Sequence, residues 1–194
     1  MLIEGMNDLN DAVAFALAAQ SNWPASMYMP DGQFVMTYDS GEKAPDNEVL
    51  GPVTPRGGPA GLVYRGGEKI AEWGDVDRAD MTFSVAKSYL ALLTGLALGD
   101  GLIRSLDDKV ADYALDDGFT SEQNRDITWC HLLTQTSEWS GTVFGKEDRI
   151  DHNRVVGVAV ADAPKGTRRA MKKSGTFYEY NDVRVHRLSR SLLQ

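Results

Sequence analysis

A serine and a lysine that could act together open the most apolar stretch of the chain. Ser84 and Lys87 stand three positions apart within residues 82–100, TFSVAKSYLALLTGLALGD. Residues at this spacing share one face of a helix, with Cβ atoms about 5–6 Å apart, so the hydroxyl and the amine can meet. A serine needs a proton acceptor within hydrogen-bond reach to become a good nucleophile. The S-x-x-K spacing therefore predicts a nucleophile with its partner, and leaves open a helix cap followed by a solvated lysine.

Lys87 can accept a proton only if its surroundings destabilise the ammonium form. Burial does this, and so does nearby positive charge. The apolar residues that follow Lys87 are the expected source of burial: Tyr89, Leu90, Leu92, Leu93, Leu96 and Leu98. We therefore expect the helix that carries the pair also to desolvate the lysine.

The elements that must position the pair follow from periodicity and turn residues. We expect helices over residues 7–20, 84–98, 127–136 and 182–193, and a β-hairpin over residues 61–73 with a Gly-Gly turn. Shorter predictions are a strand at 34–38, a loop at 141–153, and an apolar helix or strand at 155–163. The glycine-rich stretch GDG at residues 99–101 is typical of a helix C-terminus, so we expect the second helix to end there.

Length and charge limit the classes of protein. A chain of 194 residues suits one good-sized domain or a two-lobed one, and its net charge of −8 argues against a general nucleic-acid role. The start of the chain is not typical of a signal peptide, and the longest apolar run is too short to span a bilayer. We expect a soluble, cytoplasmic protein without membrane contact, or a periplasmic one if the N-terminus is incomplete. Cys130 is the only cysteine, so no internal disulfide forms.

Basic residues gather in the last part of the sequence, beyond about residue 162. They are Lys165, Arg168, Arg169, Lys172, Lys173, Arg184, Arg187 and Arg190. Three interpretations stay open: a solvated basic face, the mouth of a site for an anionic substrate, or a surface that another segment covers.

Three segments, in order, carry a resemblance to one family. They are TFSVAK at residues 82–87 with the helix that follows, LLTQTS at 132–137, and GTFYEYND at 175–182. Together they resemble the class C β-lactamase-related serine hydrolases, which include penicillin-binding proteins, D-aminopeptidases, esterases and oligoamide hydrolases. The resemblance covers roughly residues 60–194, and Gln135 stands where the family usually has histidine.

The resemblance implies a role for each matching residue. Ser84 would be the nucleophile, Lys87 the amine that holds or removes its proton, and Tyr180 the tyrosine that shares the acid–base work. Asp182 departs from the asparagine usual at its position. A carboxylate there would raise the pKa of Lys87, so Tyr180 would have to accept the proton. Tyr178 falls where the family usually has phenylalanine and puts a second phenol nearby; the alternative is that both tyrosines only pack.

The fold that the resemblance implies is α+β, a serine β-lactamase or DD-peptidase-like domain in which an antiparallel sheet carries a helical lobe. We expect a single incomplete domain over residues 1–194, with a helix and the first strands in 1–80 and the helical lobe with the motifs in 81–194. The family's returning strands and third motif have no counterpart before Gln194, and Lys173-Ser174-Gly175 comes too early to be that motif. One oxyanion donor would be missing, and an unpaired sheet edge invites self-association or a complementing chain.

The expected reaction is cleavage of a small-molecule ester or amide through an acyl-enzyme. A β-lactam, a D-peptide, a carboxylester and an oligoamide all stay open as substrates. Asp182 and Trp139 are the candidate substrate-binding residues. No cofactor and no metal is expected, because His131, His152 and His186 fit no metal-binding spacing and His131 is assigned a structural role. The alternative function is a truncated, catalytically impaired or non-catalytic ligand-binding fragment that needs a second chain.

Overall fold

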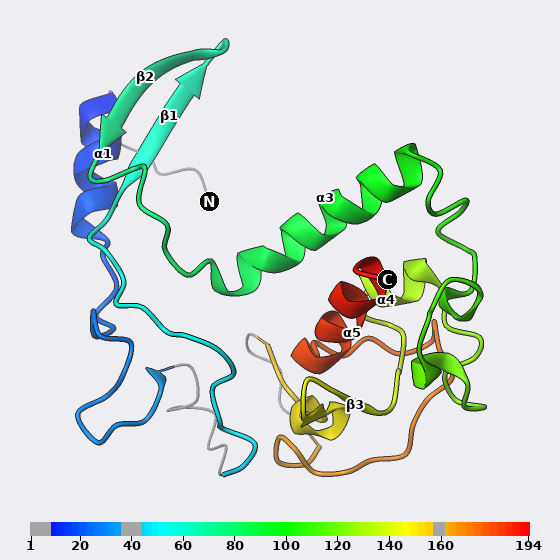
Figure 1. Ribbon diagram of the computed structural model, residues 1–194. Helices are drawn as coiled ribbons and strands as arrows, with labels where there is room; N and C mark the ends of the chain where they lie inside the picture. Colours follow the sequence, from blue (N-terminus) through cyan, green and yellow to red (C-terminus); the bar gives the residue numbers. More distant parts are fainter. Residues whose placement is uncertain (1–8, 36–43, 157–161) are drawn as a thin grey trace. The chain divides into compact units, whose positions relative to one another are not determined.

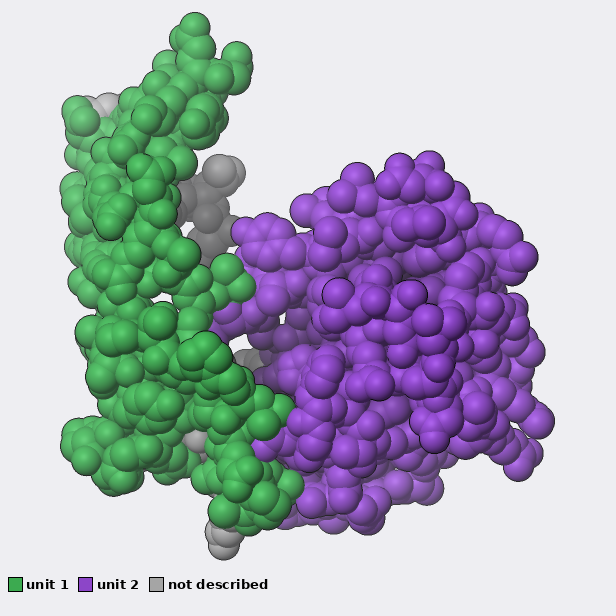
Figure 2. All heavy atoms as spheres, viewed as in Figure 1, with its two compact units in different colours: residues 1–82 green, residues 83–194 purple. Residues whose placement is uncertain are grey.

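The computed structural model describes residues 9–35, 44–156 and 162–194 (Figure 1). The chain divides into two compact units, residues 1–82 and 83–194, which Figure 2 colours separately. Each unit combines helix with a two-stranded antiparallel sheet, which makes the chain α+β. The sequence placed the division between residues 80 and 81. None of the helices in the described ranges has both the length and the apolarity that a membrane span requires.

The described part of the first unit includes a helix and a hairpin. Helix α1 is Leu9–Ala18, within the predicted range of 7–20, whose first two residues lie outside the described part. Strands β1 (Gly61–Arg65) and β2 (Glu68–Trp73) pair antiparallel around Gly66 and Gly67. Both glycines have positive φ, at 61° and 87°, which a tight two-residue hairpin turn requires. The predicted hairpin is therefore confirmed.

The strand expected at residues 34–38 is reduced in the described part to one bridge. Phe34 pairs antiparallel with Tyr28, and their rings lie with centroids 5.8 Å apart. Residues 36–38 lie outside the described residues.

The second unit begins with the helix that carries Ser84 and Lys87. A 3-10 turn, Phe83–Val85, leads into α3, which is Ala86–Gly99. Beyond the helix, Gly101 takes a φ of 75° and its N–H donates to the Leu98 carbonyl at 3.2 Å. This left-handed glycine satisfies a terminal carbonyl, and it confirms the predicted helix end.

The apolar residues of α3 do not desolvate Lys87 as expected. Leu92, Leu93 and Leu96 are 66%, 53% and 63% exposed, and Tyr89 is exposed as well. Only part of the helix packs inward, through Leu90, Ala97 and Leu98. The expectation was wrong because neighbours in sequence point to different faces of a helix, and Tyr89, Leu92, Leu93 and Leu96 lie on exposed faces. The groups around Lys87 come from the far end of the chain instead.

The core of the second unit is built from short elements and loops. Helix α4 is Trp129–Leu133, strands β3 and β4 are Thr142–Val143 and Lys146–Glu147, and a 3-10 helix spans Asp148–Asp151. Residues 141–153 therefore contain a small hairpin and a helical turn where a loop was expected. Helix α5, Asp182–Leu192, lies alongside α3 (Figure 1). The buried apolar residues that cluster into this core are Ile103, Val110, Phe119, Ile127, Trp129, Leu132, Trp139, Val143, Val183 and Leu188. Most of the apolar segment expected at 155–163 lies outside the described residues.

Helix α4 is shorter than predicted, but its start and the role of its histidine are confirmed. The Thr128 hydroxyl accepts from the His131 N–H, and the Thr128 N–H donates to His131 Nδ1, both at 3.2 Å. This reciprocal arrangement caps the helix, so His131 is structural. The helix ends early because Gln135 takes a φ of 55°, which turns the chain away from the helical path.

A buried network of ion pairs joins Arg184 of α5 to Glu138, Arg169 and Glu179. Arg184 Nη1 lies 2.7 Å from Glu138 Oε1 and 3.2 Å from Glu179 Oε2. Arg169 Nη2 contacts the same two carboxylates at 2.6 and 2.7 Å. Because a buried charge is costly without a partner, each of these four side chains needs the others. Arg169 and Arg184 therefore face inward. They belong neither to a solvated basic face nor to the mouth of a site for an anionic substrate, which were two of the interpretations left open for the basic residues.

A second carboxylate ties the C-terminal half of α5 to a loop. Asp116 accepts two hydrogen bonds from the Arg187 guanidinium, at 2.9 and 2.7 Å, and one from Arg190 at 2.8 Å. Asp116 also accepts from the Gly118 N–H at 3.0 Å. Such bidentate contacts are among the stronger polar ones. Together with the Glu138 network they fix α5 at both ends.

The buried network predicts that stability depends on pH through Glu138. Burial raises the pKa of this carboxyl, but hydrogen bonds from Arg169 and the Lys172 N–H outweigh it and lower the pKa to about 2 from an ordinary 4.5. Glu138 therefore stabilises the fold above its unfolded pKa, and this contribution disappears as the pH falls towards about 2. We expect about 3 kcal/mol of unfolding free energy to depend on this residue between about pH 5 and pH 2, as measured by urea denaturation.

The variant Glu138→Gln isolates this contribution. It should be less stable at neutral pH, because Arg169 and Arg184 lose a carboxylate, and its stability should fall less steeply on acidification. Glu122→Gln, at an exposed site outside the network, is the matched control and should keep the wild-type slope. Equal slopes for wild type and Glu138→Gln would contradict the assignment.

Candidate active site

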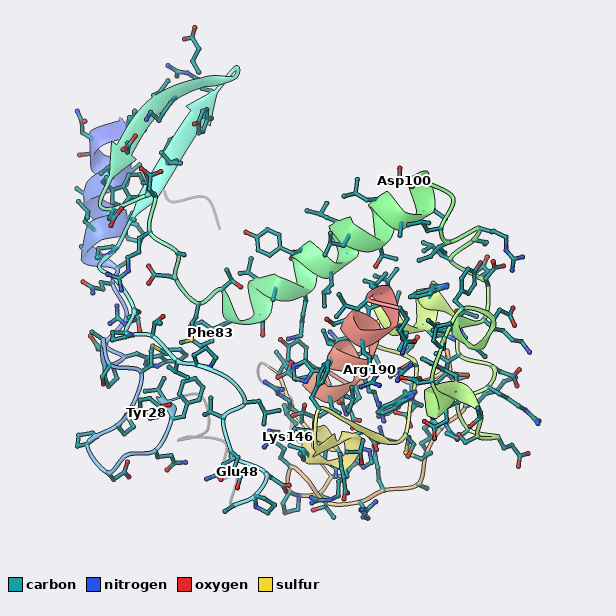
Figure 3. All side chains as sticks on the ribbon, in the orientation of Figure 1. Tyr28, Glu48, Phe83, Asp100, Lys146 and Arg190 are labelled. Carbon is teal, nitrogen blue, oxygen red and sulfur yellow. The ribbon has the colours of Figure 1, made fainter. Side chains whose placement is uncertain are left out.

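Ser84 stands at the entrance of α3, where the backbone is strained. It is the middle residue of the 3-10 turn and is exposed. Phe83, directly before it, takes a φ of 47°, a left-handed conformation that is uncommon outside glycine and costs of order 1–3 kcal/mol. Figure 3 labels Phe83 at the start of α3 and Asp100 at its end. The N-terminal end of a helix also carries partial positive charge, which favours an anion there.

Lys87, in the first turn of α3, reaches Ser84 as the spacing predicts. Its Nζ donates to Ser84 Oγ at 3.1 Å. The side chain is 22% exposed, so the solvated lysine of the alternative interpretation is not what the structure shows. The serine and the amine are therefore paired within one turn of the chain.

Tyr180 completes the contact from a distant part of the chain. Its hydroxyl donates to Ser84 Oγ at 2.7 Å, across 96 residues of sequence. The Lys87 Nζ also lies 4.7 Å from the centroid of the Tyr180 ring. Tyr178, the other phenol of the motif, is 59% exposed. The structure thus brings together the hydroxyl, the amine and the phenol that the sequence nominated, and it selects Tyr180 over Tyr178 for the contact with Ser84.

Gln135 holds the segment that carries Tyr180. Its backbone carbonyl accepts from the Glu179 N–H at 3.2 Å, and its side-chain Oε1 accepts from the Asn181 N–H at 3.0 Å. Asn181 in turn caps α5 by accepting from the Arg184 N–H at 3.1 Å. Sequence reasoning noticed Gln135 only as a replacement for histidine and missed this role. The signal that could have found it is its place in the LLTQTS motif.

Asp182 pairs with two cations of the chain. One carboxylate oxygen lies 2.6 Å from Lys87 Nζ, and the other lies 2.6 Å from Arg154 Nη1. The backbone N–H of Asp182 donates to Asp151 at 2.7 Å. Since both carboxylate oxygens already face cations, the prediction that Asp182 binds substrate is not supported. Its place is beside the lysine, at the point where the first turns of α3 and α5 meet.

This ion pair determines the charge of Lys87. Burial lowers the pKa of Lys87, but hydrogen bonds to Asp182 and Tyr180 together with the Asp182 charge outweigh it, and the pKa is raised. For Asp182 burial raises the pKa, and its bonds with Lys87 and Arg154 lower it overall. Both groups are therefore charged at neutral pH. The predicted effect of a carboxylate on the lysine is confirmed, and it makes Lys87 a fixed cation and a poor base.

Trp139 belongs to the core and not to an open site. It is 2% exposed, and its indole Nε1 donates to the Gly118 carbonyl at 2.7 Å. A side chain with so little exposed surface has no face to offer a substrate. The prediction that Trp139 contacts substrate is therefore wrong, because an aromatic residue near a motif is a core residue as readily as a lining one.

Arg154 is the site residue that sequence reasoning missed. Besides its contact with Asp182, its guanidinium carbon lies 4.6 Å from the centroid of the Tyr180 ring, and Nη1 lies 3.1 Å from Asp151. It stands in an irregular stretch after the 3-10 helix and belongs to no motif, so the sequence carried no signal for it. Among the described residues, no three His, Cys, Asp or Glu side chains group so as to hold a metal ion.

Comparisons with known proteins add no relative: no family model, curated protein or solved structure matches this chain. The resemblance to β-lactamase-related hydrolases therefore stays a prediction that depends on the three motifs and on the geometry around Ser84.

The geometry predicts that Asp182→Asn lowers the pKa of Lys87. The substitution removes the charge of the side chain that most stabilises the ammonium form, while burial of the lysine remains. The titration of Lys87 can be followed by NMR of a chain labelled with ¹³Cε-lysine, with Lys87→Arg to assign the signal. Asp126→Asn, which removes the partner of Lys109 at an exposed site, is the matched control and should leave Lys87 unchanged. An unaltered Lys87 titration in Asp182→Asn would contradict the ion pair.

Gly175 is predicted to be needed by the irregular segment that leads to Tyr180. Its N–H donates to the Thr136 carbonyl at 2.8 Å, its φ is 83°, and an added Cβ would lie 2.6 Å from His131 Nε2. Gly145 has a φ of 76° but open space around it, so it is a matched control. Gly145→Ala should cost about 1–2 kcal/mol from backbone strain alone. Gly175→Ala should cost at least about 1 kcal/mol more, measured by urea denaturation. Equal losses would show that His131 gives way freely.

Proposed function

We propose that the chain is a serine hydrolase that cleaves an ester or an amide through an acyl-enzyme on Ser84, and that its fold is related to the serine β-lactamases and DD-peptidases. The observation that carries the proposal is the convergence on Ser84 Oγ of Lys87 at 3.1 Å and Tyr180 at 2.7 Å. Either of these contacts alone is ordinary. Two proton-active groups on one exposed serine hydroxyl, held by a buried ion network, fit the requirements of an activated nucleophile.

Tyr180 is the proton acceptor in this proposal. In its phenolate form it takes the Ser84 proton across the 2.7 Å contact while Oγ forms a bond to the substrate carbonyl carbon. The bond from that carbon to the leaving oxygen or nitrogen then breaks, and Tyr180 returns the proton to the leaving group. Lys87 does not take the proton, because Asp182 keeps it charged. Its ammonium group instead stabilises negative charge on the phenol oxygen and on Ser84 Oγ.

The backbone contributes to the charge that develops on the substrate oxygen. The Ser84 N–H stands where α3 begins, at the positive end of the helix dipole. A donor at this position stabilises the oxyanion of a tetrahedral intermediate. The strain at Phe83 holds Ser84 in this orientation, so the hydroxyl and the amide of the same residue serve the reaction. Water then releases the acid, with Tyr180 as the base. The four substrate classes named from the sequence remain candidates.

A fluorophosphonate probe tests the proposal. Wild type should be labelled covalently, and Ser84→Ala should lose all labelling. Lys87→Met and Tyr180→Phe should lower the labelling rate at least about 10²-fold, the usual effect of removing a proton-transfer group. Labelling is quantified by mass spectrometry of the intact protein and of its peptides.

Ser88→Ala, an exposed serine one turn further along α3, is the matched control and should label at the wild-type rate. Equal labelling of wild type and Ser84→Ala would overturn the assignment of the nucleophile. Wild type that is folded but unlabelled would favour the non-catalytic ligand-binding alternative.

A further inference from the structure

Arg154 contacts two carboxylates and the aromatic ring of the Ser84 site. Its Nη1 lies 2.6 Å from Asp182 and 3.1 Å from Asp151, and its guanidinium carbon lies 4.6 Å from the centroid of the Tyr180 ring. The side chain is about three-quarters buried, at 24% exposure. A guanidinium in this setting is always charged, and its Nη1 donates to both carboxylates, which restrains the side chain. Its position against the phenol is therefore determined and not a chance surface contact.

We propose that Arg154 is a positioning residue for the reaction at Ser84: it holds a permanent positive charge against Tyr180 and so keeps that phenol able to accept the Ser84 proton. The proposal rests on the function proposed above and adds a residue to it. No motif of the sequence contains Arg154, and the role follows from its contacts alone.

Arg154 can favour negative charge on Tyr180 because two cations near the phenol share one carboxylate, that of Asp182. Asp182 binds Lys87 through one oxygen and Arg154 through the other. The two cations lie 4.7 and 4.6 Å from the centroid of the same aromatic ring. Positive charge at this distance favours negative charge on the ring and its oxygen. Asp182 carries a single negative charge against these two positive ones.

The charged and titratable groups around Tyr180 come from several elements. They are Lys87 on α3, Asp151 and Arg154 in and after the 3-10 helix, Lys165 paired with Asp151, Glu179 paired with Arg169, and Asp182 and His186 on α5. Burial lowers the pKa of His186, so this imidazole is neutral at neutral pH. Glu179 and Asp151 are each paired with cations. Lys87, Arg154 and Lys165 thus face the two carboxylates of Asp151 and Asp182, which leaves one positive charge unbalanced near the phenol.

The test compares Arg154→Gln with Arg154→Lys in the full chain. The first readout is the rate of fluorophosphonate labelling as a function of pH. The second is NMR of a chain labelled with ¹³Cζ-tyrosine, in which Tyr180→Phe assigns the Tyr180 signal, and it reports ionisation of the phenol without any activity. Arg168→Gln is the matched control, because Arg168 is 72% exposed and pairs with Glu147 outside the site. Circular dichroism and thermal melting check the fold of each variant.

Arg154→Gln should lower the labelling rate at neutral pH about tenfold and move its rise with pH upward by about one unit. The two figures correspond, because a change of one pKa unit is a factor of ten. The Tyr180 signal should titrate correspondingly later. Arg154→Lys keeps the charge and should stay within about threefold of wild type, with an unmoved pH profile. Arg168→Gln should match wild type in both readouts.

A double-mutant cycle separates action through Tyr180 from a general structural effect. If Arg154 acts through the phenol, Arg154→Gln should change the labelling rate of Tyr180→Phe less than about twofold, although it changes wild type tenfold. Full additivity of the two substitutions would overturn the proposal.

Further outcomes decide the matter independently of the proposed hydrolase. If labelling depends on Ser84 but Arg154→Gln leaves both the pH profile and the Tyr180 titration unmoved, the role of Arg154 is overturned and the proposed function stands. If wild type is not labelled, the proposed function fails, and the NMR titration still shows whether Arg154 favours the phenolate. If Arg154→Gln does not fold, Arg154→Lys decides: a shift of its pH profile by one unit or more overturns the assignment, because its charge is kept.

Discussion

The carboxylate of Asp182 is the interaction on which the geometry around Ser84 depends. It is the first residue of α5 and binds Lys87 in the first turn of α3, so it joins the two helices where both begin. A carboxylate in the first turn of a helix is also favoured by the helix dipole. Through its second oxygen it holds Arg154, and both cations then face the ring of Tyr180. One residue thereby determines the charge of the lysine and the surroundings of the phenol.

The ion network of Glu138, Glu179, Arg169 and Arg184 holds Tyr180 in position, although the residues around Tyr180 belong to loops. Glu179, next to Tyr180 in sequence, contacts Arg169 and Arg184, and both arginines also bind Glu138. Because each buried charge requires its partners, the segment before α5 has few alternative positions. Gln135 also accepts hydrogen bonds from two backbone N–H groups of the same segment, one through its carbonyl and one through its side chain. The polar interior of this unit thus performs the positioning that a continuous sheet performs elsewhere.

The charge pattern of the sequence acquires its meaning from these pairs. Acidic residues dominate the first part of the chain and basic residues the end, which suggested a basic surface. The structure instead sends Arg184 and Arg187 inward, where they meet Glu138 and Asp116 from the middle of the chain. The asymmetry along the sequence is therefore complementary charge between segments that pack together. It says little about a charged partner.

Local physics accounts for what the sequence could predict. The helix spacing that brings Lys87 to Ser84, the glycine pair that turns β1 into β2, and the cap at Thr128 all involve residues within a few positions of one another. Such contacts follow from backbone geometry, which the residue types report directly. The α+β class came from the family resemblance. The pairing of Ser84 with Tyr180 was nominated by a motif resemblance, since no local rule connects residues so far apart.

Tertiary packing alone decided the rest. The sequence could not show that three leucines of α3 stay exposed, that Trp139 fills the core, or that Arg154 reaches Tyr180. Each of these depends on which face of an element meets another element, and that choice is a property of the packed chain. The sequence by itself therefore determined the chemical groups and their local spacing. The fold determined which of them share a site and what charge they carry there, because both depend on distances between segments and on exclusion of water.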